Sequence, residues 1–112
     1  MSAIGNTPFA FSPATINIAG STLSFTAATS VPSAVQSTAG QDTYLVSNSG
    51  SSVVQLGVAS TQAAASTNAS TLANSIPLLP GTTQVLVLGR NQWFTGYSAS
   101  AAVVYVTPGS GI

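Results

Sequence analysis

The sequence predicts an all-β protein, a small antiparallel β-sandwich or barrel with an extended N-terminal arm. Short runs alternate between apolar and polar residues, which is the period of a half-buried strand. Turn residues separate these runs at a spacing typical of small sandwiches and barrels. The 112 residues are 45% hydrophobic, enough to build one core, so we expect a single β domain over residues 1–112.

Six runs have the composition and spacing of strands: residues 15–20, 22–27, 43–48, 52–58, 83–89 and 101–107. In the third run, for example, Tyr44 and Val46 face away from Leu45. The last two runs are the densest in Val, Leu and Tyr, which is typical of strands near the centre of a sheet.

Two turns are predicted from Asn, Gly and Pro. Asn48-Ser49-Gly50 follows the third strand, and it predicts a short hairpin to the fourth because Asn and Gly accept left-handed backbone. Pro80-Gly81 predicts a type II turn, in which Gly takes the position with positive φ.

Two segments lack strand periodicity. Residues 59–75 are rich in Ala, Ser and Thr, and we expect a surface loop rather than a short helix because Ser, Thr and Asn favour caps and turns. Residues 1–12 predict an arm that lies on a neighbouring subunit, with a frayed terminus as the alternative. Phe9 and Phe11 of this arm are candidate contact residues.

The chain is almost free of charge. It contains one basic residue, Arg90, and one acidic residue, Asp42, with no His. Nucleic-acid binding depends on Lys and Arg side chains that neutralise phosphates, so we expect no nucleic-acid partner. No apolar run is long enough to cross a bilayer, so we expect no membrane partner.

The same composition argues against catalysis. Metal sites need clustered His, Cys, Asp or Glu, and Asp42 stands alone. A Ser or Thr nucleophile would lack a His or Lys to activate it. We therefore expect no enzyme activity, no catalytic residue, no metal site and no cofactor. The absence of Cys is consistent with synthesis in a reducing cytoplasm.

An aromatic group after Arg90 supplies the other candidate contact residues, Trp93, Phe94 and Tyr97. Exposed aromatic and Arg side chains often anchor protein interfaces, and aromatic faces also bind sugars. The alternative is that one or two of these rings close the open end of the sandwich as core residues.

A neutral surface favours assembly. Like charges normally keep monomers apart, and Lys residues on edge strands normally prevent edge pairing. A chain without them suits a state in which neighbours cover its edges, so we expect a homo-oligomer or a lattice.

The segment from Asp42 to Gly111 resembles small all-β virion proteins of tailed bacteriophages. The resemblance rests on "YLVSNSGSSVVQLGV", a polar Ala-rich insert, "IPLLPGTTQVLVLG", an aromatic stretch and the closing "AAVVYVTPGSG". Many such proteins end in "TPGEG", where this chain has Ser110 in place of the acidic residue.

The resemblance implies a capsid decoration or cement protein on the exterior of the virion, made in the host cytoplasm. Its partners would be the major capsid protein and copies of itself. The alternative is a receptor- or glycan-binding β module on a tail or fibre, with Trp93 and Tyr97 as stacking surfaces.

Overall fold

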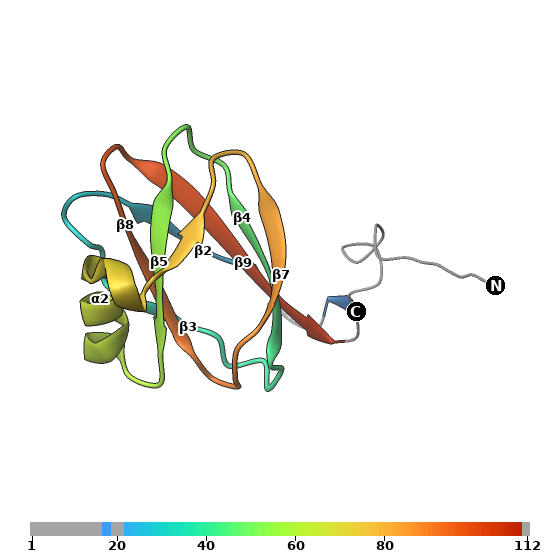
Figure 1. The fold of residues 1–112 in the computed structure, drawn as a ribbon. Coiled ribbons are helices and arrows are strands. Elements are labelled where there is room, and N and C mark those ends of the chain that lie inside the picture. Colours follow the sequence, from blue (N-terminus) through green and yellow to red (C-terminus); the bar gives the residue numbers. More distant parts are fainter. Residues whose placement is uncertain (1–16, 19–21, 111–112) are drawn as a thin grey trace.

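The computed structural model describes residues 17–18 and 22–110 and confirms an antiparallel β-sandwich (Figure 1). The predicted arm over residues 1–12, with Phe9 and Phe11, lies outside the described residues. The strands are β1 (Asn17–Ile18), β2 (Leu23–Ala27), β3 (Val35–Gln36), β4 (Thr43–Asn48), β5 (Val54–Ala59), β6 (Ile76–Leu78), β7 (Thr83–Val87), β8 (Trp93–Ser98) and β9 (Ala102–Ser110). Helices α2 (Gln62–Ser70) and η2 (Leu72–Asn74) lie between β5 and β6.

The strands form two sheets. The first sheet has the order β1-β9-β4-β7, and β2 also pairs with β9. The second sheet has the order β3-β8-β5-β6. The central ladders join distant segments, since Val46 lies opposite Val106 and Leu56 lies opposite Gly96. Long-range pairing therefore determines the architecture.

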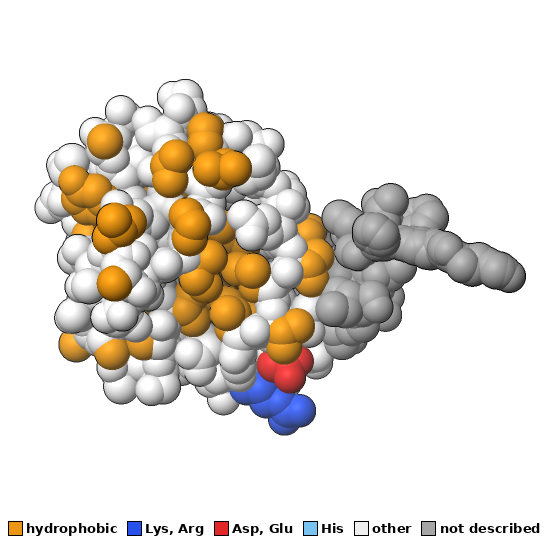
Figure 2. All heavy atoms as spheres, viewed as in Figure 1, with side chains coloured by type: hydrophobic (Ala, Val, Ile, Leu, Met, Phe, Trp, Pro, Cys, Tyr) orange, Lys and Arg blue, Asp and Glu red, His pale blue; other side chains and the backbone are white. Residues whose placement is uncertain are grey.

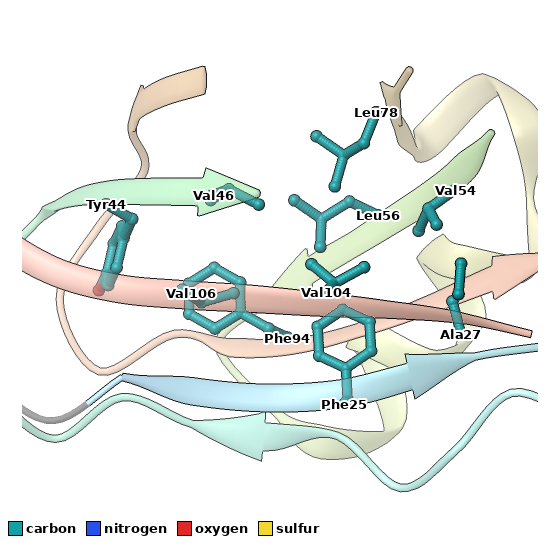
Figure 3. Close-up of a cluster of buried hydrophobic side chains, with 11 residues drawn as sticks. Phe25, Ala27, Tyr44, Val46, Val54, Leu56, Leu78, Phe94, Val104 and Val106 are labelled. Carbon is teal, nitrogen blue, oxygen red and sulfur yellow. The ribbon is translucent and has the colours of Figure 1, made fainter. Parts of the chain in front are cut away.

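The core lies between the sheets, where the inward positions of both sheets meet (Figure 3). In β4 and β9 every second side chain is inward, as the alternation predicted: Tyr44 and Val46 are buried, and so are Val104 and Val106. Leu56 of β5 packs against them from the second sheet. The predictions for residues 43–48 and 101–107 are confirmed, including the central position of β9.

The sandwich is joined along one side. Ala28, directly after β2, forms a bridge with Tyr97 of β8. The carbonyl of Ala28 also accepts a hydrogen bond of 3.1 Å from the Ser98 N–H. On the opposite side of the two sheets, β6 and β7 are the edge strands among the described residues.

The Pro80-Gly81 turn, which connects β6 to β7, is confirmed. Gly81 has φ +70°, and the Thr82 N–H donates to the Leu79 carbonyl at 3.3 Å. Both are features of the turn that Pro and Gly predicted.

The predicted hairpin at Asn48-Ser49-Gly50 is wrong. The strands on either side of it, β4 and β5, belong to different sheets, so the segment is a crossing between sheets. The side chain of Asn48 organises this crossing, because its Oδ1 accepts the Gly50 N–H at 2.9 Å. The motif correctly predicted that the chain turns after β4, but β5 does not pair with β4 as a hairpin requires.

The structure corrects two further strand predictions. Residues 83–89 do not form a central strand, because β7 pairs only with β4 among the described strands. The second sheet has two inner strands, β5 and β8, and the alternation missed β8. β8 contains Gly96 in its interior, where glycine normally weakens a strand. A Cβ atom there would lie 2.9 Å from both Phe25 and Val54, so the glycine allows the sheets to approach.

The predicted loop over residues 59–75 is wrong, because it contains α2 and η2. Thr61 caps α2 by accepting the Ala64 N–H at 3.2 Å. Hydroxyl groups inside the helix bond back to the preceding turn, as Thr67 does to the Ala63 carbonyl at 3.1 Å. The Thr67 and Ser70 hydroxyls are thus satisfied within the helix, whereas Asn68 donates to the Val58 carbonyl of β5 at 3.0 Å. The face of the helix that carries Ala65 and Ala69 packs on β5.

Candidate contact surfaces

The candidate contact residues near Arg90 lie in different surroundings. Arg90 is exposed in the turn between β7 and β8. Trp93 and Tyr97 are half-buried at the two ends of β8. These three residues remain available for contact, whereas the two arm residues lie outside the described part of the chain.

Phe94 is a core residue, so the prediction that it is a contact residue is wrong. Its exposed fraction is 0%, and its ring packs edge-to-face on Tyr44 with the centroids 4.9 Å apart (Figure 3). The residue next to it, Trp93, faces the other side of the strand, because side chains alternate along β8. The alternative interpretation, that one of the aromatic rings fills the sandwich, holds for Phe94.

Trp93 and Tyr97 do not form one aromatic platform. They share the outer face of β8 but stand four residues apart, which is about 13 Å along a strand. Thr95 lies between them, fully buried, and donates a hydrogen bond of 2.7 Å to the Pro32 carbonyl. Helix α2 also contacts β8. Each ring is therefore a separate contact point.

The outer face of the first sheet carries an apolar group that the sequence analysis did not single out. We call it the outer apolar patch: Leu45, Val85, Val87, Val103 and Tyr105. These residues occupy the positions of β4, β7 and β9 that alternate with core positions. Val87 is 63% exposed and Tyr105 is 44% exposed. Alternation within residues 83–89 and 101–107 places these residues on one face of each strand, and the pairing of β4, β7 and β9 gathers them into one patch.

Hydroxyl groups border the outer apolar patch and also interrupt it. Register places Ser24 and Ser47 on either side of Tyr105, and Thr26 opposite Val103. Because Ser47 lies on β4, between β9 and β7, polar uncharged groups stand among the apolar side chains as well as beside them. A partner that covers this surface would bury apolar side chains and would not need charged residues of its own.

One end of the sandwich carries a second exposed apolar pair, Val53 and Leu79. The two residues flank the last pair of the β5–β6 ladder, Val54 and Leu78. Beside them the buried side chain of Asn48 fixes the chain by donating to the Leu78 carbonyl at 3.0 Å. The exposed pair therefore sits on rigid backbone.

The face shown in Figure 2 is mostly uncharged, and its acidic and basic side chains lie together at one end. Within the described residues, no three His, Cys, Asp or Glu side chains gather into a metal-binding group. Residues 17–18 and 22–110 contain no helix that is long and apolar enough to cross a membrane.

Tyr44 is the one ionisable side chain of the core among the described residues. Its hydroxyl lies 2.6 Å from the Gly89 carbonyl and 2.9 Å from the Gln41 carbonyl, and its single proton serves one of them at a time. Burial raises the pKa of Tyr44 above its ordinary value of 10.0. The neutral phenol is thus the form that the fold favours.

This environment predicts how stability depends on pH. From about pH 5 to 9 the unfolding midpoint should stay nearly flat, because Asp42 is the only carboxylate side chain and the chain has no His, Lys, Cys or Glu. Above pH 10 the unfolded chain ionises Tyr44 first, since the pKa is higher in the folded state. Stability should therefore fall as the pH rises through the folded-state pKa.

Thermal unfolding between pH 5 and 11 tests this prediction. Tyr44→Phe should be less stable at neutral pH but lose less stability at alkaline pH than the native chain. Tyr105→Phe, at an exposed position, is the matched control and should keep the alkaline loss. An equal alkaline loss in the two variants would contradict the role of Tyr44.

Comparison with known protein families, with curated proteins and with solved structures found no match to this chain. The resemblance to virion proteins of tailed bacteriophages stays a prediction from the sequence.

Proposed function

We propose that this protein is a structural, non-enzymatic component of a bacteriophage virion, a decoration or cement protein on the exterior of the capsid. It binds the lattice of the major capsid protein and bridges neighbouring subunits. Copies of the chain also contact one another in the assembled shell. Each contact adds buried apolar area to a junction that repeats across the lattice.

The observation that carries this proposal is the outer apolar patch with its uncharged border. Large exposed apolar groups on a rigid sheet mark interaction sites. With one Arg and one Asp in the chain, association meets little charge repulsion and depends little on ionic contacts. A repeated, crowded lattice suits such a surface, and the sequence resemblance supplies the kind of lattice.

The alternative function, receptor or glycan binding on a tail or fibre, would use Trp93 and Tyr97 as stacking surfaces. The buried Thr95 between them separates the two rings. A single ring still stacks on a sugar, but the geometry that favoured a sugar platform is missing. We therefore rank the decoration role first.

Copy number in purified particles of the encoding phage tests the proposal. A decoration protein should be present in hundreds of copies per capsid and should rebind to stripped particles. Binding should change little between low and moderate sodium chloride, and sulfate should strengthen it. Absence from particles, or a handful of copies located in the tail, would overturn the proposal.

The Trp93→Ala variant tests whether Trp93 is a contact residue or a core residue. If Trp93 anchors attachment, binding to particles should weaken by about 2 kcal/mol or more, with a smaller change in the free energy of unfolding. Phe94→Ala is the matched core variant and should lower unfolding stability by about 3–5 kcal/mol. Urea unfolding and particle binding of both variants give the answer. Loss of stability in Trp93→Ala as large as in Phe94→Ala would place Trp93 in the core.

A further inference from the structure

The edge of β7 that faces away from β4 pairs with no other described strand. β7 forms one edge of the first sheet, and among the described strands it pairs only with β4 (Figure 1). Its sequence, Thr83–Val87, contains no Pro, Gly or charged residue. Natural edge strands usually carry one of these to block pairing with another chain.

Two hydrogen bonds show which backbone groups of β7 face outward. The Leu88 N–H donates to the Asp42 carbonyl at 2.9 Å, and the Asn48 N–H donates to the Thr82 carbonyl at 3.0 Å. Both pairs extend the β4–β7 register by one residue, at its two ends, and each shows an even-numbered residue bonded to the β4 side. Because the two pair types alternate, the even-numbered residues of β7 bond to β4.

The odd-numbered residues, Thr83, Val85 and Val87, therefore direct their N–H and C=O groups away from β4. Their side chains lie on the outer face of the sheet, where Val85 and Val87 belong to the outer apolar patch. A strand added here would gain backbone hydrogen bonds and extend the apolar patch at the same time.

We propose that the edge of β7 pairs with β7 of a second copy, antiparallel, about a twofold axis at Val85. In this register Val85 lies opposite Val85 of the second copy, and Thr83 lies opposite Val87 of the second copy. The same groups serve both chains, which is the condition for a twofold interface. Three hydrogen-bonded pairs with two bonds each then join the sheets.

Three features favour a second copy as the partner. The edge is self-complementary, and the two outer apolar patches become continuous across the axis. The chain has a formal net charge of 0, so two copies do not repel each other. Antiparallel pairing also places the Val87 end of one strand at the Thr83 end of the other. The Arg90 side chains of the two copies therefore stay apart.

The pairing should be weak in isolation. Each copy contributes five strand residues, against about 20–30 residues per side in a standard interface. We expect dissociation constants of about 0.1–1 mM, which repetition within an assembly would strengthen. Pairing of β7 strands would be one of the contacts between copies in the proposed capsid role. It can be tested with the isolated protein alone. Its failure and the failure of the capsid proposal are therefore separate outcomes.

Sedimentation equilibrium of the full chain up to millimolar concentration is the first experiment. The native chain should show a monomer–dimer equilibrium. Val85→Pro removes an N–H that faces away from β4, so the monomer should keep its fold while dimerisation falls at least tenfold. Val85→Thr keeps the N–H and the β-branched shape, and it should still dimerise.

Cross-linking provides the second experiment, because the chain has no cysteine. In the proposed register the Cα atoms of the two Val85 residues are about 5.5 Å apart. Those of the two Val87 residues are about 14 Å apart. A short thiol-to-thiol reagent should therefore join Val85→Cys into a dimer and leave Val87→Cys largely monomeric. Equal cross-linking of the two variants would overturn the register.

Hydrogen exchange distinguishes the remaining outcomes. At high concentration the amides of Val85 and Val87 should gain protection that dilution removes. A monomer at millimolar concentration overturns the proposal, whether these amides exchange fast or another segment of the same chain protects them. A dimer that Val85→Pro leaves intact also overturns it. If Val85→Pro does not fold, the comparison of the two cysteine variants decides.

Discussion

Replacing Gly57 by Ala should lower the free energy of unfolding by about 3 kcal/mol. Gly57 lies in the middle of β5, where α2 rests directly on the strand. An added Cβ atom would lie 2.5 Å from the Ala69 nitrogen and 2.7 Å from its Cβ, and it would also overlap the Ala65 carbonyl oxygen. Backbone atoms cannot rotate away as a long side chain does, so the helix must move off the sheet.

Urea unfolding measures the loss, and two variants test its cause. Gly89→Ala is the matched control, because the nearest atoms there belong to the flexible Gln92 side chain, and it should cost less than 1 kcal/mol. Adding Ala69→Gly to Gly57→Ala should restore little stability, since the Ala65 carbonyl still blocks the site. A loss below 1 kcal/mol for Gly57→Ala would mean that α2 is not tightly docked.

The strands that alternation predicted correctly have one face in the core and one face toward solvent. In β9, Val104 and Val106 face the core while Tyr105 is exposed, so the pattern carries a period of two. β8 was missed because the middle of its outer face is buried as well as its inner face. Phe94 packs into the core, and Thr95 lies under other segments on the opposite face. Burial on both faces removes the alternation that reveals a strand.

The helix and the sheet crossing depend on tertiary contacts that no local pattern contains. In α2 the Ser, Thr and Asn residues dilute the helix preference of Ala, and the match between Gly57 and the small side chains Ala65 and Ala69 compensates for it. At Asn48, an Asn-x-Gly motif typical of hairpins serves a crossing instead. The choice between these structures depends on where β9 and β8 pair, which involves residues far along the chain.

The contact residues were predicted with less success than the strands. Grouping by closeness in sequence placed Trp93 and Phe94 together, although neighbours in a strand face opposite ways. The residues exposed on the first sheet, Val87 and Tyr105, were assigned to strands but not to a surface. Strand period alone would have separated the two aromatic residues, whereas the outer apolar patch required the pairing of β4, β7 and β9.

Asn48 is the buried polar group on which the crossing between the sheets depends. Its exposed fraction is 0%, and its Nδ2 donates to the Ser52 carbonyl at 2.9 Å and to the Leu78 carbonyl at 3.0 Å. Its Oδ1 accepts the Gly50 N–H at 2.9 Å. The three bonds hold the β4–β5 crossing against β6, so one side chain satisfies backbone groups of the crossing and of β6.

Asn48→Ala should lower the free energy of unfolding by about 3–5 kcal/mol, the largest loss we expect from a single polar substitution. The substitution leaves two carbonyls and one N–H without their partner, and each buried unsatisfied group costs about 1–3 kcal/mol. Water entering the space recovers part of this loss. Asn74→Ala, at an exposed position of η2, is the control and should change stability by less than 1 kcal/mol.

Asn48→Asp tests the direction of the hydrogen bonds, because it keeps the shape and removes the donors. The carboxylate would face two carbonyl oxygens in a buried site, so the pKa of the introduced Asp should rise well above about 3.9, its value in the unfolded chain. Its protonated form donates to one carbonyl. The variant should therefore lose about 1–3 kcal/mol below about pH 4, because one carbonyl stays without a donor, and progressively more as the pH rises through the folded-state pKa. Unfolding in urea at pH 3.5 and pH 7 measures the difference. Equal losses at both pH values would mean that the introduced carboxyl group leaves the buried site and that the crossing opens to solvent in the variant. That result would remove Asn48 as the organiser of the sheet crossing.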